Sequence, residues 1–268
     1  MDKIIGFIGG GNMAKAIIGG IIRSNLVNPQ DIIASAKSKK TIDELGKEYG
    51  IKTTLNNKEI AKRADYLIIA VKPHIYGEVL GEIKDVLGEK TVVIGIAAGI
   101  SSEYIKEGLD NKVQVVKAMP NTPALVGEGM TGLAFDSFIS EENKEEVLKI
   151  FNSFGRTEII GEDLMDAFTA ISGSSPAYVY MMIEAMADAG VLEGIARKQA
   201  YIMAAQAVLG AAKMVLDTGA HPALLKDNVC SPGGTTIEAV AKLEEGGFRS
   251  SIIGAMKVCA DKSKIMSK

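Results

Sequence analysis

The chain has 268 residues, of which 47% are hydrophobic, so it can bury the core of one large domain or of two modest ones. Its 30 Lys and Arg residues nearly balance 33 Asp and Glu residues, which leaves no long-range field to attract nucleic acid or an anionic membrane. This composition argues against a disordered or fibrous protein, and we expect a small metabolite as the partner.

The N-terminal stretch and the two cysteines indicate the cellular compartment of the protein. Residues 4–22 are apolar but are interrupted by three consecutive glycines, and no small-residue cleavage site follows, so we do not expect a secretory signal. A membrane span needs roughly 20 apolar residues, and the richest candidate, residues 177–195, carries three carboxylates. Cys230 and Cys259 show no CxxC spacing. We therefore expect a cytoplasmic protein with free thiols and no membrane association.

The first part of the chain, to about Gly161, alternates short β-branched runs with segments of helical period. This alternation is typical of βα units that build a parallel sheet. The expected strands are residues 4–8, 31–35, 66–71, 92–96 and 113–118. The expected helices are residues 13–24, 41–49, 58–63, 75–87 and 102–109. Two further strands, residues 132–135 and 157–160, flank an expected helix at residues 141–154, and the sequence does not indicate their direction.

Beyond Leu164 the pattern changes to runs of Ala, Met, Leu and Ile at helical spacing. The expected helices are residues 176–194, 198–218, 235–245 and 248–263. Helices rich in Ala and Met on more than one face often pack against a partner subunit, and an ordinary monomeric bundle is the alternative. The sequence thus predicts an α/β domain over residues 1–161 and an all-helical domain over residues 162–268.

A glycine-rich segment follows the first expected strand and opens directly into a helix. It reads Gly9-Gly10-Gly11-Asn12-Met13-Ala14, a GxGxxA form of the dinucleotide-binding pattern. Glycines permit a tight turn and let the backbone approach a pyrophosphate, whose charge the free N–H groups of the helix terminus can meet. A structural glycine turn is the alternative, and a Walker A loop is excluded because the GK[ST] ending is missing. The α/β domain is therefore expected to be a Rossmann-like, dinucleotide-binding domain.

The end of the second expected strand bears on the choice of cofactor. An acidic residue there would bind the ribose 2′-hydroxyl, but the chain has Ser35 and Lys37 and no carboxylate before Asp43. Hydroxyls and cations suit the 2′-phosphate of NADPH, although solvated lysines at a helix start would look the same. We expect Asn57 to add a contact near the adenosine.

After the third of these strands, Val71-Lys72-Pro73 is expected on the nicotinamide side of the ligand crevice. Pro73 at the first position of a helix also has a purely structural explanation. His74, which follows, is more often a surface or capping residue than a catalyst, and we do not assign it a role.

Six segments carry a family resemblance. They are GFIGGGNMAKAI, AVKPH, MPNTPALVGEG, ISGSSPAYVY, VCSPGGTTIEAV and GGFRSSI. Their order and spacing resemble those of the pyrroline-5-carboxylate reductases, and the resemblance covers essentially the whole chain. The pair SGSSPAY and SPGGTT is the most specific part of it.

The resemblance implies an activity and an assembly. Such enzymes transfer hydride from NADPH to the cyclic imine 1-pyrroline-5-carboxylate and give L-proline, in the last step of proline biosynthesis. The helical domain would then bind substrate and form a homodimer, with dimers able to assemble into a decamer of five dimers. Because SAKSKK departs from relatives that carry Arg or Asn in this stretch, we expect that NADH can also serve.

The segment SPGGTT is expected to hold the substrate. It opens the helix at residues 235–245, whose exposed N–H groups can bind a carboxylate. By the resemblance, Thr236 is the catalytic candidate and contacts the ring nitrogen, while Gly234 and Thr235 contribute backbone contacts. The alternative is a Ser/Thr cluster that caps the helix and has no catalytic duty.

Other positions follow from the same resemblance. Ser174 and Ser175 lie where a helix should begin and are candidates for substrate binding, and the GxSxG of a hydrolase is absent. Glu162 matches a position near bound proline and Asn228 one that touches the cofactor, with helix capping as the alternative for both. Ala97 completes the cofactor-binding candidates, and no metal site is expected.

Two other functions remain to be weighed. A β-hydroxyacid dehydrogenase would carry a catalytic lysine in a KxxN pattern on the first long helix of the second domain, where residues 177–189 contain no lysine. A noncatalytic dinucleotide sensor would leave SGSSPAY and SPGGTT unexplained.

Overall fold

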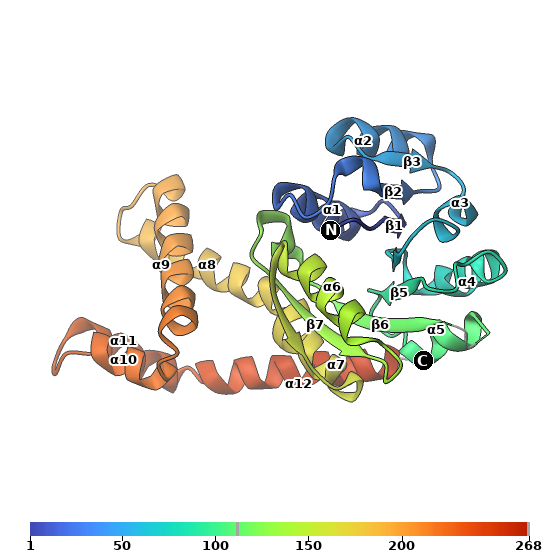
Figure 1. Cartoon of the computed structure of the whole chain (residues 1–268). Helices are drawn as coiled ribbons and strands as arrows, with labels where there is room; N and C mark the ends of the chain where they lie inside the picture. Colours follow the sequence, from blue (N-terminus) through green and yellow to red (C-terminus); the bar gives the residue numbers. More distant parts are fainter. Residues whose placement is uncertain (111–112, 267–268) are drawn as a thin grey trace. The chain divides into compact units, whose positions relative to one another are not determined.

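The computed structural model describes residues 1–110 and 113–266, and the chain divides into two compact units (Figure 1). Unit 1 comprises Met1–Ser174 together with the C-terminal segment from Cys259. Unit 2 comprises Ser175–Val258. The expected boundary at residue 161 stays a prediction.

Unit 1 is built on an eight-stranded sheet with the order β3-β2-β1-β4-β5-β6-β7-β8. The strands are β1 Ile5–Ile8, β2 Ile32–Ser35, β3 Lys52–Thr54, β4 Tyr66–Ile69, β5 Val92–Gly95, β6 Gln114–Met119, β7 Gly129–Phe135 and β8 Gly155–Ile159. The first six strands are parallel, β7 is antiparallel to β6, and β8 is parallel to β7. The carboxyl ends of β1 and β4 therefore open at one edge, on either side of the point where the strand order reverses.

Helices cover both faces of this sheet. They are α1 Asn12–Arg23, α2 Lys39–Tyr49, α3 Asn57–Ala61, α4 Tyr76–Ile83, α5 Ser102–Gly108, α6 Glu141–Asn152 and α7 Met165–Phe168. Ile17 of α1 and Phe151 of α6 lie in one buried cluster, while Leu80 of α4 and Ile105 of α5 lie in another. The β-branched strands read as continuous apolar runs because both of their faces are buried.

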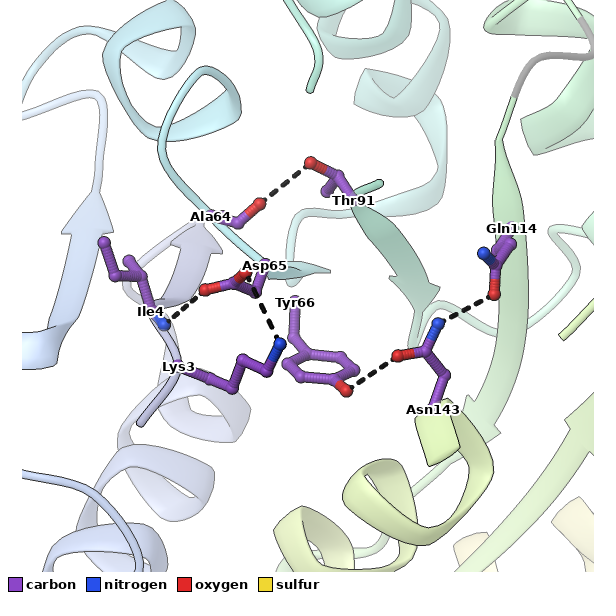
Figure 2. A network of polar contacts seen from close by, with 8 residues as sticks. All are labelled: Lys3, Ile4, Ala64, Asp65, Tyr66, Thr91, Gln114 and Asn143. Carbon is purple, nitrogen blue, oxygen red and sulfur yellow. Dashed lines mark hydrogen bonds and ion pairs between the residues drawn. The ribbon is translucent and has the colours of Figure 1, made fainter. Parts of the chain in front are cut away.

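A polar network ties together the edge of the sheet where the parallel strands begin (Figure 2). The Ile4 N–H donates to the Asp65 carboxylate at 2.8 Å, and the Tyr66 hydroxyl donates to the Asn143 side chain at 3.0 Å. The Thr91 hydroxyl donates to the Ala64 carbonyl at 2.8 Å. These contacts order the amino ends of β1, β4 and β5, and the opposite edge is left for a ligand.

Unit 2 is helical. Its helices are α8 Ser175–Leu192, α9 Arg197–Thr218, α10 Pro222–Val229, α11 Thr235–Glu245 and the first part of α12 Phe248–Met266. Helices α8 and α9 pack closely on each other, and Ala187, Ala200 and Ala204 are buried. The fold class expected from the sequence, a Rossmann-like domain with a helical second domain, is confirmed.

Several elements differ from those expected. The strand β3 was not expected, because its three residues are too few to show a period and none of them is fully buried. No helix was expected between residues 218 and 235, whereas Pro222–Val229 form α10: the His221 ring accepts the Ala223 N–H at 3.2 Å, and Pro222 occupies the first turn. The helix expected at residues 75–87 ends at Ile83.

One helix of the described residues, α9, is long and apolar enough to cross a membrane by length and composition. The expectation that no segment would pass such a test, and that residues 177–195 came nearest, was therefore wrong. Only 11% of its apolar window is buried within the chain. An exposed apolar helix of this kind is also what a subunit interface requires.

Candidate cofactor site and substrate residues

The glycine turn joins β1 to α1, and its three glycines have different roles. Gly9 has a φ of +109°, and a Cβ there would lie 2.5 Å from the Ala70 carbonyl oxygen. A Cβ on Gly10 would lie 2.8 Å from the Leu45 side chain, whereas a Cβ on Gly11 would meet nothing within 4 Å. Gly11 is the N-cap of α1, no side chain caps this helix, and its first residues, Asn12 and Met13, line the cavity described below. Such a terminus is suited to a pyrophosphate.

A cavity of about 850 Å³ opens beside this turn at the carboxyl edge of the sheet. It brings together twelve of the thirteen cofactor-binding candidates: Gly9, Gly10, Gly11, Asn12, Met13, Ser35, Lys37, Asn57, Val71, Lys72, Pro73 and Ala97. The thirteenth, Asn228, lies on α10 in unit 2. The residues thus fit an extended dinucleotide: a glycine turn for the pyrophosphate, Lys37 at the end of β2, and an apolar wall at Ala97.

The cavity also has an acidic side that the sequence analysis did not anticipate. Glu78 and Glu82, one helical turn apart on α4, both line it. On a helix with an apolar face, two carboxylates four residues apart would ordinarily be assigned to solvent. Their place in the cavity depends on how α4 packs on the sheet.

Three side chains at the end of β2 form a chain of hydrogen bonds. The Ser35 hydroxyl donates to Asn57 Oδ1 at 2.6 Å, and Asn57 Nδ2 donates to Glu82 Oε2 at 2.7 Å. Ser35 is only 1% exposed. The Ser35 hydroxyl hydrogen is therefore committed within the protein.

Lys117 on β6 is a buried cation behind the cavity wall, with 3% of its surface exposed. Its ammonium donates a hydrogen bond to the carbonyl oxygen of Ala97. Burial lowers the pKa of Lys117 to about 8, and the negative charges of Glu162 and Asp166 partly offset this effect. Lys117 thus holds the backbone at Ala97, where the wall of the cavity turns away from β5.

Glu162 does not line the cavity. Its carboxylate accepts hydrogen bonds from the Ser102 N–H at 2.7 Å and from the Ser102 hydroxyl, at the first residue of α5. The side chain therefore stabilises the start of α5, and its expected place near the substrate stays a prediction.

The serine segment SGSS begins within an unusual helical turn. Residues Thr169–Gly173 form a π-helical turn between α7 and α8, and the Ser174 N–H donates to the Thr169 carbonyl at 2.9 Å. The Ser174 hydroxyl accepts a hydrogen bond from Cys259 Sγ at 3.1 Å. Ser175 begins α8, so the expected helix start is confirmed. Single π-helical turns are frequent at functional sites.

In unit 2, α11 begins at Thr235 and Gly234 is its N-cap, with no side-chain cap hydrogen bond. Gly233 has a φ of +65°, which turns the chain into the helix. The helix terminus expected at SPGGTT is thus present, with Thr236 in its first turn. Because no side chain caps this helix, the cap alternative does not account for the two threonines.

Comparison with known proteins

A Rossmann-type sheet with a glycine turn beside a large cavity defines the class of dinucleotide-dependent oxidoreductases. Residues 4–99 match the family described as NADP oxidoreductase, coenzyme F420-dependent. Residues 162–266 match the family described as pyrroline-5-carboxylate reductase dimerisation.

The relatives extend this match to the whole chain. The chain is 50% identical over 268 residues to the pyrroline-5-carboxylate reductase of Escherichia coli strain K12, covering 100% of both chains. It is 42% identical over 267 residues to that of Methanosarcina acetivorans, covering 100% of this chain and 99% of the relative. The chain belongs to the pyrroline-5-carboxylate reductase family, and the resemblance drawn from its motifs is confirmed.

Solved structures agree. A pyrroline-5-carboxylate reductase from Coxiella burnetii superposes with a TM-score of 0.94 at 36% identity, covering 100% of both chains. The enzyme from Plasmodium falciparum, solved with NADP bound, gives a TM-score of 0.90 at 34% identity, covering 100% of this chain and 99% of that one. A 3-hydroxyisobutyrate dehydrogenase from Salmonella typhimurium gives 0.53 at 18% identity over 72% of this chain and 69% of that chain, and shares the fold alone.

Proposed function

We propose that this chain reduces 1-pyrroline-5-carboxylate to L-proline with NADPH as the hydride donor. Its membership of the family over its full length supports this activity. The observation that carries the proposal is the cavity at Gly11, where a Cβ would meet nothing within 4 Å and no side chain caps α1.

The bound cofactor supplies the hydride, and the chain supplies binding and orientation. The backbone of Gly9–Gly11 admits the pyrophosphate, and Lys37 offers a cation to the 2′-phosphate. Pro73 and Ala97 form the apolar wall that excludes water from the nicotinamide. Lys72 and Asn228 are proposed as further polar contacts, and NADH is proposed as a weaker donor.

The substrate is proposed to be held by the first turn of α11. The first N–H groups of α11, from Thr235 on, suit its carboxylate, and Gly234, whose own N–H donates to the Ser231 carbonyl at 3.0 Å, is proposed to let the substrate approach the backbone. The Thr236 hydroxyl is proposed to hydrogen-bond the ring nitrogen, and so to favour the protonated iminium that accepts hydride. Ser174, Ser175 and Glu162 are proposed as further substrate-side residues.

We propose that the active form is a homodimer built through unit 2, and that dimers assemble further into a decamer. The dimerisation family covers residues 162–266. On α9, Met203, Leu209 and Leu216 are each more than half exposed in a single chain. A second copy of the chain can bury these side chains.

A cytoplasmic location is proposed because Cys230 and Cys259 are not joined in a disulfide.

An absorbance assay at the NADPH band tests the activity directly. We expect oxidation of NADPH when the imine is supplied, and slower oxidation of NADH. A folded protein that binds NADPH but does not oxidise it with the imine would instead be a dinucleotide sensor.

The role of Thr236 is tested in the same assay. Thr236→Ala should remain folded, because its hydroxyl caps no helix, and should lose at least about 100-fold in kcat/KM, the usual size of a proton-transfer contribution. Thr218→Ala, at the exposed end of α9, is the matched control and should keep its activity. Unchanged kinetics in Thr236→Ala would remove it from the mechanism.

A further inference from the structure

The side-chain amide of Asn57 is held at both ends. Its oxygen accepts from the Ser35 hydroxyl at 2.6 Å, and its nitrogen donates to a carboxylate oxygen of Glu82 at 2.7 Å. All three residues line the cavity, and they come from β2, α3 and α4. The contact between Asn57 and Glu82 spans 25 residues of sequence.

Glu82 determines which way the amide faces. An ionised carboxylate can only accept hydrogen bonds, so the Asn57 nitrogen must face Glu82 and the oxygen must face Ser35. A serine hydroxyl can either donate or accept, so Ser35 alone would allow the amide to rotate by half a turn. Without Glu82, two orientations of the amide would compete.

This orientation leaves one polar hydrogen uncommitted in the trio. The Ser35 hydrogen is used by Asn57, and one of the two Asn57 amide hydrogens is used by Glu82. The second amide hydrogen is not used within the trio, and Asn57 lines the cavity together with Ser35, the last residue of β2. The end of this strand is where Rossmann domains bind the 2′ substituent of the adenosine ribose.

We propose that Glu82 is a positioning residue for cofactor selection, which fixes the Asn57 amide so that its second hydrogen is presented to the 2′-phosphate of NADPH. The inference rests on the proposed function for the identity of the cofactor. Glu82 acts through Asn57, because its own negative charge would repel a phosphate. Its benefit therefore depends on its being able only to accept a hydrogen bond, and not on attraction by its charge.

A glutamine at position 82 separates these two properties. Glu82→Gln removes the charge but can donate as well as accept, so it no longer excludes the second orientation of the Asn57 amide, and NADPH should bind more weakly than to the unaltered chain although a negative charge has been removed. Glu82→Ala removes the acceptor, and NADPH should bind about tenfold more weakly, as expected for one hydrogen bond to a charged group. Because NADH lacks the phosphate, Glu82→Ala should weaken NADH binding by less than about threefold.

The experiment is an equilibrium titration of each cofactor, followed by its own fluorescence, with no imine present. The variants are Glu82→Ala, Glu82→Gln, Asn57→Ala and the double Ala variant, with Glu103→Ala on the exposed face of α5 as control. If Glu82 acts through Asn57, Glu82→Ala should no longer weaken NADPH binding in a chain that already carries Asn57→Ala. Thermal unfolding should show the same midpoint for all the single variants.

Three results would overturn the inference. One is an equal effect of Glu82→Ala with and without Asn57, and another is an equal loss for NADPH and NADH. The third is tighter NADPH binding in Glu82→Gln than in the unaltered chain, which is the result that removal of the charge alone would give. Because the titration needs no turnover, it stays separate from the proposed function, which fails if the unaltered chain binds NADPH and does not reduce the imine.

Discussion

The side chain of Asn121 donates hydrogen bonds to both the carbonyl oxygen and the hydroxyl of Ser172, at 3.1 and 3.2 Å. Asn121 Oδ1 also accepts the Met130 N–H at 2.9 Å. Both Asn121 and Ser172 are more than 90% buried. These hydrogen bonds join the motif MPNTP to the π-helical turn in which the serine segment begins. Two motifs that lie far apart in sequence therefore form one structural unit.

Asn121→Asp should lower the free energy of unfolding by about 3 kcal/mol, because it removes two donated hydrogen bonds and places a carboxylate against a carbonyl. Urea unfolding measures this. Asn152→Asp is the control, since Asn152 is exposed and accepts from Thr157, as an aspartate can. Equal losses in the two variants would show that the buried contact contributes nothing.

Two glycines of the turn, Gly10 and Gly11, should respond differently to alanine. Gly11→Ala should keep its stability within about 0.5 kcal/mol, because the added Cβ meets nothing, yet it should weaken NADPH binding by occupying the pyrophosphate approach. Gly10→Ala should lower the free energy of unfolding by about 1–3 kcal/mol, because its Cβ would press on the side chains of Leu45 and Thr41.

Thermal unfolding and a cofactor titration on both variants separate these effects. If Gly11→Ala binds NADPH like the unaltered chain, the pyrophosphate does not lie on this turn.

Lys117 should make stability depend on pH. Its pKa is about 8 in the fold against 10.5 for the free side chain, so between these values the unfolded state binds more protons. The contribution of Lys117 to the free energy of unfolding should therefore rise by roughly 2–3 kcal/mol from pH 7 to pH 10.

Lys117→Met provides the reference, because it cannot titrate. The unfolding free energy of the unaltered chain relative to this variant should rise over that range and stay flat between pH 6 and pH 7. A constant difference up to pH 10 would mean that Lys117 is not buried as a cation.

The exposed apolar side chains of α9 should mediate assembly. Leu209→Glu should convert the protein to a species of single-chain mass, measured by light scattering after size-exclusion chromatography, because a carboxylate would be buried unpaired in the interface. Phe138→Glu is the control: Phe138 is 78% exposed but lies in unit 1, outside the dimerisation match. A Leu209→Glu protein of unchanged mass would exclude α9 from the interface.

Local features of the fold were predictable from the sequence. The glycine turn, its strand and its helix are contiguous, so their period and turn chemistry identify them together. Thr235 was expected as the start of α11, which agrees with the structure, because the glycines before it are a strong boundary signal.

Contacts over long sequence distances were not predictable. Ser35 was chosen for its hydroxyl, but only the fold reveals that Asn57 and Glu82 consume it. Lys117 lies in an expected strand, and only the fold reveals that it is buried and that the charges of Glu162 and Asp166 act on it. The direction of β7 also depends on pairing, which a single strand does not encode.

The central claim is that hydride passes from the cofactor held at the glycine turn to the imine carbon. NADPH carrying deuterium at the transferred position of the nicotinamide, incubated with the protein and 1-pyrroline-5-carboxylate, tests it by mass spectrometry of the product. We predict proline with a single deuterium on the former imine carbon. Unlabelled proline, or oxidised cofactor without proline, would contradict the account.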